Sequence, residues 1–370
     1  MLRSIFICGF AVGLFLSCSQ CQSNDTLVDA NYNGKTILTT ADLQSKFAGK
    51  QANFDESFKV SQTDVIIDKA QLFADHYPSS NERRIDLFRP YIENLGGAYI
   101  GVGTDQNLTF IAWARSPVAY LMDFDSVIVY VNKLHLLFLK ESADFATFKS
   151  MWSQANRNQT LDWLKENLGN RADYQQYLQA YNTAMVPGMG VPARLNQLNW
   201  MSVHYGFKSF HNDVSDYNYL RQMVLDGRIQ AIVGDMNATV SFQQVSASAK
   251  RLNIPIRLVY FSNAEEYFRY PDGFRHNIEN LYTDDLGFIV RTVTSGAKEF
   301  GFPDGELLPD TFPFHYNLQS ISKMKIWMKD APHPLWVYQM LKARTDVKKG
   351  FSVLMKDPYE AGFLKPSANK

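Results

Sequence analysis

A glycine turn at the end of an apolar run is the feature that most constrains how this chain can fold. The run Ala98-Tyr-Ile-Gly-Val-Gly-Thr-Asp-Gln-Asn107 is followed, about twenty residues later, by Leu121-Met-Asp-Phe-Asp125. Glycines let a backbone approach a ligand closely, and an acid at this spacing accepts hydrogen bonds from ribose hydroxyls. The order therefore predicts a parallel α/β sheet with a nucleoside-binding crevice at one edge.

Length and composition limit the possible partners. A chain of 370 residues is long enough for one large α/β domain with additions, or for two domains. Hydrophobic residues make up 46% and charged residues 20%, which is typical of a protein with a packed core. Lys and Arg total 37 and Asp and Glu total 37, so there is no basic surplus to neutralise phosphates. Composition therefore gives no support for a nucleic-acid partner.

The N-terminus has the pattern of a targeting segment. Arg3 supplies a positive charge, the apolar run 5–16 is too short to span a bilayer, and Phe15-Leu-Ser-Cys18 resembles a bacterial lipobox. We expect lipidation at Cys18 and anchoring to a membrane of the bacterial cell envelope. Cleaved secretion and a retained anchor are the alternatives. The cysteines of the chain, Cys8, Cys18 and Cys21, all lie in or beside this leader, so we expect no disulfide framework in the folded body.

We expect four parts along the chain. They are a signal peptide with a lipobox, a polar flexible tether, an α/β domain and a C-terminal tail, at residues 1–18, 19–55, 56–345 and 346–370 respectively. The α/β domain is expected to open with helices within residues 56–95. It is also expected to carry a helical insertion at about 141–210, because amphipathic helical patterns fill that stretch without a strand pattern.

Strand-like and helix-like segments alternate after residue 95, as they do in parallel α/β sheets. The expected strands are apolar runs that end in turn residues, at 98–102, 119–123, 229–233, 254–261 and 287–292. Residues 314–321 are expected as an edge strand and residues 335–343 as a closing helix. Run 254–261 is almost continuously apolar, which favours a central strand covered on both faces.

Several phrases of the chain resemble a known fold family. YIGVGTDQN, MDFD, GRIQAIVGDM and YFSNAEEYF are similar to an uncharacterised group of bacterial proteins assigned the class I S-adenosylmethionine-dependent methyltransferase fold. The resemblance covers roughly residues 96–292, interrupted by the helical insertion. It implies a Rossmann-like, mostly parallel sheet with helices on both faces, and S-adenosylmethionine as the possible cofactor.

The resemblance also implies a role for each turn at the strand ends. Gly101 and Gly103 would lie against the methionine part of the cofactor, and Asp123 or Asp125 would bind its ribose. The turn Gly234-Asp235-Met236 would hold the adenine amine. Asn263 and Glu265 would lie beside the substrate, where either could assist proton loss from a methyl acceptor.

The first motif departs from the family pattern at two positions. Tyr99 stands where the family has an acid that contacts the cofactor's ammonium group, and Asp105 stands where it has a third glycine. A carboxylate at Asp105 would lie near the cofactor's own carboxylate, and like charges repel strongly at low dielectric. Asp105 could instead hold a cationic group.

Each of these features also has a purely structural explanation. The glycine pair could form a tight turn, Asp125 could cap the helix that begins at Ser126, and the turn at Asp235 could be a simple cap. We expect Asp125 to cap and Asp123 to bind. His204 and His211 lie seven residues apart without an acidic partner, so we expect no metal site.

Three functions remain open from the sequence. We favour an envelope lipoprotein that binds a small ligand at the strand ends, because an exported domain works where S-adenosylmethionine is not made. The alternative is an active S-adenosylmethionine-dependent methyltransferase, and a second alternative is a non-catalytic structural or adhesive surface protein. A fold by itself does not carry its usual chemistry.

Overall fold

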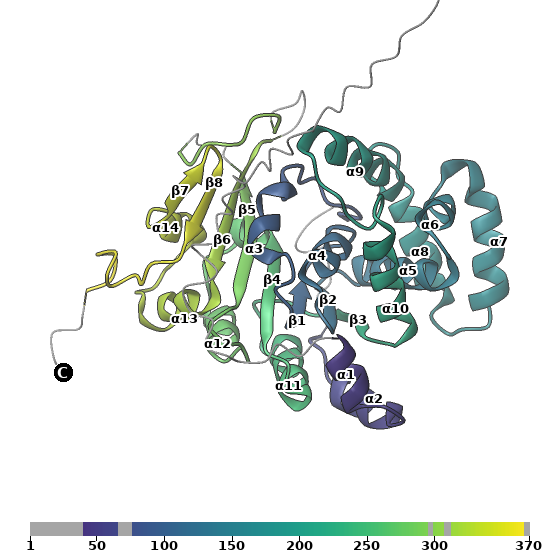
Figure 1. The fold of residues 1–370 in the computed structure, drawn as a ribbon, viewed down its shortest axis with the longest axis horizontal. Coiled ribbons are helices and arrows are strands. Elements are labelled where there is room, and N and C mark those ends of the chain that lie inside the picture. Colours follow the sequence, from purple (N-terminus) through teal and green to yellow (C-terminus); the bar gives the residue numbers. More distant parts are fainter. Residues whose placement is uncertain (1–39, 66–75, 295–298, 307–311, 366–370) are drawn as a thin grey trace, which may run out of the picture. The chain divides into compact units, whose positions relative to one another are not determined.

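The computed structural model describes residues 40–65, 76–294, 299–306 and 312–365. In that part of the chain eight strands form a single sheet in the order β3-β2-β1-β4-β5-β6-β8-β7 (Figure 1). The strands are β1 (Ala98–Gly101), β2 (Ala119–Asp123), β3 (Ile229–Val233), β4 (Ile256–Ser262), β5 (Phe288–Thr294), β6 (Phe314–Ser320), β7 (Thr345–Lys348) and β8 (Phe351–Leu354).

The sheet is mostly parallel, as predicted. Strands β3, β2, β1, β4 and β5 all run in the same direction, and β6 is antiparallel to β5. Strand β1 pairs with β2 on one side and with β4 on the other, so the strand order reverses there. This order is that of doubly wound α/β sheets, which bind ligands outside the carboxyl ends of the strands at such a reversal.

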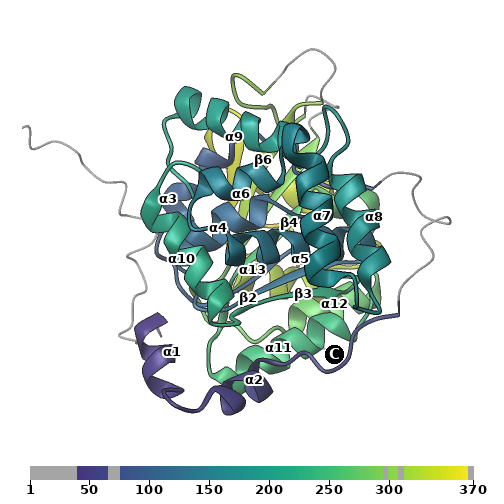
Figure 2. The ribbon, with the colours of Figure 1, turned by 90° about the vertical axis from the view of Figure 1, so that its right-hand side faces the viewer.

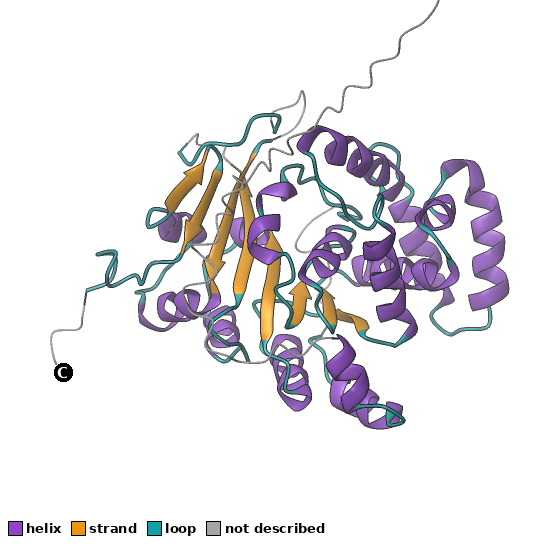
Figure 3. Cartoon of the chain, viewed as in Figure 1, coloured by secondary structure: helices purple, strands orange, loops and turns teal. Residues whose placement is uncertain are grey.

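Helices cover both faces of the sheet (Figures 1 and 3). Successive strand residues such as Tyr99 and Ile100 pack into different hydrophobic clusters, because side chains alternate between the two faces of a strand. The Tyr99 face packs against α3 (Arg89–Ile92), α4 (Gln106–Ala114) and α5 (Ser126–Glu141). The Ile100 face packs against α11 (Ser241–Leu252), α12 (Asp272–Glu279), α13 (Ile321–Asp330) and α14 (Val337–Leu341). The expectation of helices on both faces is confirmed.

A helical insertion separates β2 from β3, also as predicted. It comprises α6 (Phe145–Met151), η4 (Gln154–Asn156), α7 (Arg157–Leu168), α8 (Tyr174–Ala184) and α9 (Val191–Tyr205), and α10 (Val214–Leu225) leads back to the sheet. These helices lie on the Tyr99 side and face the viewer in Figure 2. Their apolar side chains continue the cluster that covers that face, so the insertion is packed into the domain rather than appended to it.

Two boundaries differ from the sequence prediction at the ends of the domain. Residues 40–55 were expected in a flexible tether, but they contribute to α1 (Thr40–Lys46) and α2 (Gln51–Phe58), in which Leu43, Phe54 and Phe58 are buried. Residues 346–354 were expected in a C-terminal tail, but they contain most of β7 and the whole of β8. Strand β6 therefore lies inside the sheet, between β5 and β8, and the expectation of an edge strand at 314–321 is wrong.

The N-terminal helices also differ in part from the prediction. Residues 61–65 are not helical. The break near Arg89-Pro90 falls at Phe88, between η3 (Ile85–Leu87) and α3, which begins at Arg89 with Pro90 in its first turn. The expected leader and the lipidation site at Cys18 lie outside the described residues. Among the residues that are described, no helix is both long and apolar enough to cross a membrane.

The packing of α2 predicts a stability effect. The Phe58 ring lies 5.0 Å from the ring of Tyr120 on β2 and 5.3 Å from that of Phe54. Truncation in Phe58→Ala is expected to lower the free energy of unfolding by about 3–5 kcal/mol, as measured by chemical denaturation. Glu56→Ala, at an exposed position of the same helix, should change it by less than about 0.5 kcal/mol. Equal effects of the two substitutions would show that α2 does not belong to the folded unit.

Candidate functional site

The glycine turn after β1 has one packed glycine and one open glycine. A Cβ at Gly101 would collide with the side chains of Asn107 and Tyr99, whose hydroxyl donates to Asn107 Oδ1 over 2.7 Å. Gly101 therefore serves internal packing. Gly103 has a φ of +74°, which favours glycine, and a Cβ there would meet no atom within 4 Å. Space is therefore open at the Cα of Gly103 and not at that of Gly101, although the N–H and the carbonyl of Gly103 are both hydrogen-bonded, to Asp123 and Asn132.

The two aspartates after β2 have different roles. Asp123 accepts the Gly103 N–H with Oδ2 over 3.0 Å and the Asp125 N–H with Oδ1 over 2.9 Å, and its side chain is half-exposed. Asp125 is buried, caps α5 by accepting the Val127 N–H, and pairs with His76 Nδ1 at 2.8 Å. The prediction that Asp125 caps the helix is confirmed. Asp123 ties the end of β2 to the glycine turn and keeps part of its surface exposed.

Residues 76–84, which we call the strap, run along the carboxyl ends of the parallel strands. His76 contacts Asp125 after β2, and the Ser80 N–H donates to Asp105 Oδ1 after β1 over 2.8 Å. The Thr104 hydroxyl donates to the carbonyl of Pro78 over 2.9 Å. The strap thus lies at the strand reversal between β1 and β4, where ligands bind in open α/β sheets.

Glu82 anchors the strap to the next two strands. Its buried carboxylate accepts the hydroxyls of Tyr260 (2.6 Å) and Ser262 (2.8 Å) from β4 and of Thr292 (2.7 Å) from β5. Burial raises the pKa of Glu82, although these hydrogen bonds and Arg194 oppose the shift. Ser262 has a φ of +50°, a conformation that is uncommon outside glycine, and its hydroxyl is directed at this carboxylate.

Arg194 of α9 occupies the amino end of α4. Its Nε lies 3.0 Å from Asp105 Oδ2, and both side chains are buried. The guanidinium also donates to the Glu82 carbonyl over 2.8 Å and to Gln106 Oε1 over 2.7 Å. The sequence left open that Asp105 could hold a cationic group, and the cation is supplied by the protein's own insertion. The strap, the glycine turn and the insertion therefore meet at one guanidinium.

The turn after β3 lies beside the end of β2. The Gly234 N–H donates to the Asp123 carbonyl over 2.9 Å, and a Cβ at Gly234 would collide with Met122 and Ser241. The Asp235 side chain is half-exposed and accepts the Asn237 N–H over 2.8 Å, while Met236 is buried. Burial raises the pKa of Asp235. Of this turn only Asp235 offers a polar side chain to solvent beside Asp123.

The residues expected to catalyse a reaction after β4 have separate environments. Glu265 is buried and forms an ion pair with Arg291 at 2.5 Å, and it accepts the Tyr270 hydroxyl over 2.7 Å. Both oxygens of the carboxylate are thus engaged by Arg291 and Tyr270, away from a substrate. Asn263 is half-exposed, and its amide donates to the Tyr267 hydroxyl over 3.3 Å. Asn263 alone keeps the accessibility that a substrate contact requires.

Sequence reasoning missed Glu82 and Arg194. Both belong to segments without a motif, and the partners that tie them to the strand ends and to α4 lie between 88 and 210 residues away along the chain. Only an indirect indication of Arg194 is present in the sequence. An acid, Asp105, stands in the place of the third glycine, and a buried acid needs a cation nearby.

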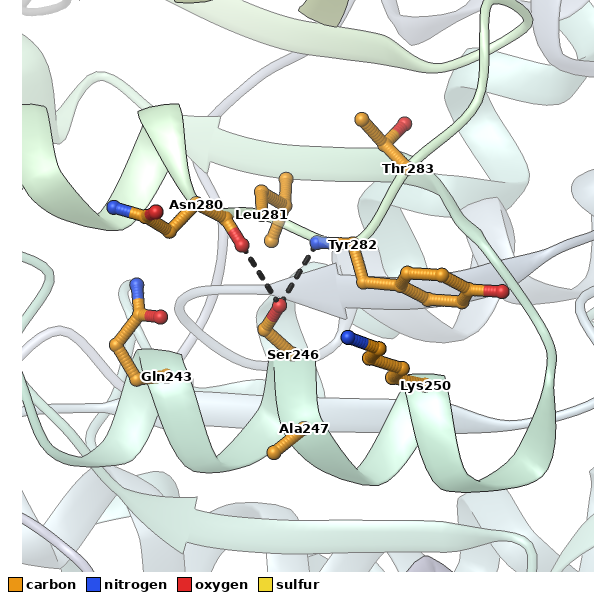
Figure 4. Close-up of a pocket in the computed structure, with 8 residues that line it drawn as sticks. All are labelled: Gln243, Ser246, Ala247, Lys250, Asn280, Leu281, Tyr282 and Thr283. Carbon is orange, nitrogen blue, oxygen red and sulfur yellow. Dashed lines mark hydrogen bonds between the residues drawn. The ribbon is translucent and has the colours of Figure 1, made fainter.

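A surface cavity of about 330 Å³ lies away from the strand carboxyl ends (Figure 4). It is bounded by α11 and by the loop that leads into β5. Ser246 bridges the two sides, because its hydroxyl accepts the Tyr282 N–H (2.8 Å) and donates to the Asn280 carbonyl (3.3 Å). Within the described ranges, no group of three His, Cys, Asp or Glu side chains is arranged to hold a metal ion.

The buried ion pair predicts a large stability effect. Arg194→Met is expected to lower the free energy of unfolding by about 3–5 kcal/mol, because it leaves Asp105 as an unpaired buried charge. Adding Asp105→Asn should recover most of that loss. Arg171→Met, which breaks an exposed pair with Asp173, should cost less than about 1 kcal/mol in chemical denaturation. If Arg194→Met lowers the free energy of unfolding by no more than this control, the buried pair with Asp105 does not hold these segments together.

Glu306 predicts a pH dependence. It accepts the Tyr316 hydroxyl over 3.1 Å, and burial raises its pKa from 4.5 to about 7. The folded state holds a proton that the unfolded state loses between these values, so the contribution of Glu306 to stability is largest below about pH 4.5 and is lost as the pH rises to about 7. Glu306→Gln should flatten this decline by up to about 3 kcal/mol in denaturation at several pH values. Exposed Glu56→Gln should leave it unchanged, and equal slopes in both variants would disprove the assignment.

Comparison with known proteins places the chain in a family without assigning an activity. No curated protein shows significant similarity to it. A family described as a domain of unknown function (DUF7790) matches residues 77–355. The match begins within the strap and ends just after β8, so it includes the whole sheet and the helical insertion. The chain belongs to this DUF7790 family.

Proposed function

We propose that this protein binds a small nucleoside-like ligand at the carboxyl ends of β2 and β3, without transferring a group to or from it. The proposal rests on a difference in exposure among the acidic side chains at this edge of the sheet. Asp123 and Asp235 are half-exposed at the ends of β2 and β3, near the free space at the Gly103 Cα in the case of Asp123, whereas Asp105 and Glu265 are buried and paired with arginines. Carboxylates beside an open glycine turn suit ribose hydroxyls and an exocyclic amine.

The resemblance to S-adenosylmethionine-dependent methyltransferases supports a site for the nucleoside part of the cofactor but not for its methionine part. The positions that would face the ribose and adenine, Asp123 and Asp235, fit that role. The positions that would face the methionine part do not fit, because Arg194 and Ser80 already satisfy Asp105. We therefore derive no methyl transfer from the site. A methyltransferase-like fold stays a proposal that is supported by the order of the first five strands.

An active methyltransferase is the second candidate. Asn263 favours it, since a half-exposed amide follows the central strand at the position of a substrate contact. Glu265 argues against it, because its carboxylate is held by Arg291 and Tyr270. We also propose that the chain is an envelope lipoprotein anchored through Cys18, on the strength of the leader pattern alone.

Calorimetric titration of the full chain with adenosine, S-adenosylhomocysteine and S-adenosylmethionine tests the proposal. We expect all three to bind with dissociation constants within about tenfold of one another, because the methionine part makes no added contact. Asp123→Ala and Asp235→Asn should each weaken binding by about tenfold or more, and exposed Asp285→Ala, which precedes β5, should not.

Two outcomes would contradict the proposal. Absence of heat with every ligand, from protein shown to be folded by circular dichroism, would favour a structural or adhesive role. S-adenosylmethionine binding about 100-fold tighter than adenosine would show that the methionine part is recognised, and would favour the methyltransferase.

A further inference from the structure

The interface between α4, α5 and α6 buries polar atoms that have no protein partner. Neither ring nitrogen of His135 makes a hydrogen bond within the described ranges, and the same is true of Asn132 Oδ1, Trp152 Nε1 and Gln106 Nε2. All of these side chains are at least 98% buried. Most buried polar groups in folded proteins are hydrogen-bonded, to protein or to ordered water. Such a concentration at one interface therefore calls for a bound partner.

Three of these side chains, Asn132, His135 and Trp152, lie around α5. The rings of His135 and Trp152 are 4.9 Å apart, and Asn132 lies three residues before His135, on the same side of the helix. Asn132 Nδ2 donates to the Gly103 carbonyl over 2.8 Å, so this side of α5 reaches the glycine turn. Gln106 belongs to the helix that follows that turn.

The unpaired atoms are complementary as donors and acceptors. Trp152 and Gln106 offer N–H groups, and Asn132 offers a carbonyl oxygen. Burial lowers the pKa of His135 to about 4, although Asp105 opposes the shift, so at neutral pH the ring offers one donor and one acceptor. A water molecule both donates and accepts, and buried waters make about three hydrogen bonds each. Water matches this set without any change in charge.

We infer that this interface is an internal binding site for ordered water, which bridges His135 to Trp152 and Asn132. His211 in the same helical layer shows the alternative arrangement, since its two nitrogens pair directly with the hydroxyls of Ser209 and Ser202. At His135 bound water takes the place of those hydroxyls. The water links the Gly103 turn to the helical insertion, and this inference does not depend on the nucleoside proposal.

A crystal structure of the protein at about 1.5 Å resolution tests the site directly. We expect a water within about 3.2 Å of a ring nitrogen of His135 and of Trp152 Nε1 or Asn132 Oδ1. An interface without water density, or a His135 ring that bonds directly to a protein atom, would overturn the inference.

Thermal unfolding of variants gives a second test. If water is bound, His135→Leu removes one of the hydrogen-bond partners of that water. Trp152 Nε1 and Asn132 Oδ1 then lose their bridge, so the Tm should fall by about 2 °C or more. If the site is dry, the same change removes a buried unpaired group and the Tm should stay or rise. His211→Leu breaks two direct hydrogen bonds and should lower the Tm in either case, which validates the assay.

Discussion

The buried ion pair between Asp105 and Arg194 is the interaction on which the architecture of the sheet edge depends. Moving an isolated charge out of water is costly, and a buried pair is tolerated only when further hydrogen bonds satisfy both groups. Here Ser80 completes the carboxylate, and Glu82 and Gln106 complete the guanidinium. Because the partners come from the glycine turn, the strap and the insertion, these three segments must fold together. If one of these segments did not fold into place, Asp105 or Arg194 would lose part of the hydrogen bonding that compensates its buried charge.

The pair also decides what the strand reversal can bind. In an open doubly wound sheet that position takes a ligand, but here the strap runs across it and Glu82 is bonded to β4 and β5. The strap thus covers the part of the sheet edge at the ends of β4 and β5. The half next to β2 and β3 keeps Asp123 and Asp235 at the surface. This division of the edge supports the proposal that the protein recognises a ligand without chemistry on it.

Local signals predicted the sheet well. Strands β2 and β3 have the predicted bounds, because each is an apolar run closed by a turn residue, and Asp125 caps α5 as its position before Ser126 suggested. Strand β7 escaped prediction because Thr345–Lys348 is exposed along its length and shows no apolar pattern. The predicted tether extended too far toward the C-terminus because α1 and α2 bury few residues each. The other residues of these helices are mostly polar and resemble a linker.

The candidate site was harder to predict than the fold. Motif positions indicated where the strand ends would meet, but not which acids would be neutralised there. Glu265 was expected beside a substrate, and its pairing with Arg291 depends on strand register, which no local pattern encodes. Long-range partners such as Glu82 and Arg194 carry no spacing signal at all, because their contacts form only when distant segments are packed.

A crystal structure of the protein grown with saturating adenosine would test the central claim most directly, that the edge of the sheet is divided. We expect density for the nucleoside beside Asp123 and Asp235, with the Asp105–Arg194 pair and the strap unchanged. Density between the ends of β1 and β4, with Arg194 or the strap displaced, would contradict it. So would an edge of β2 and β3 that stays without ligand density at saturation.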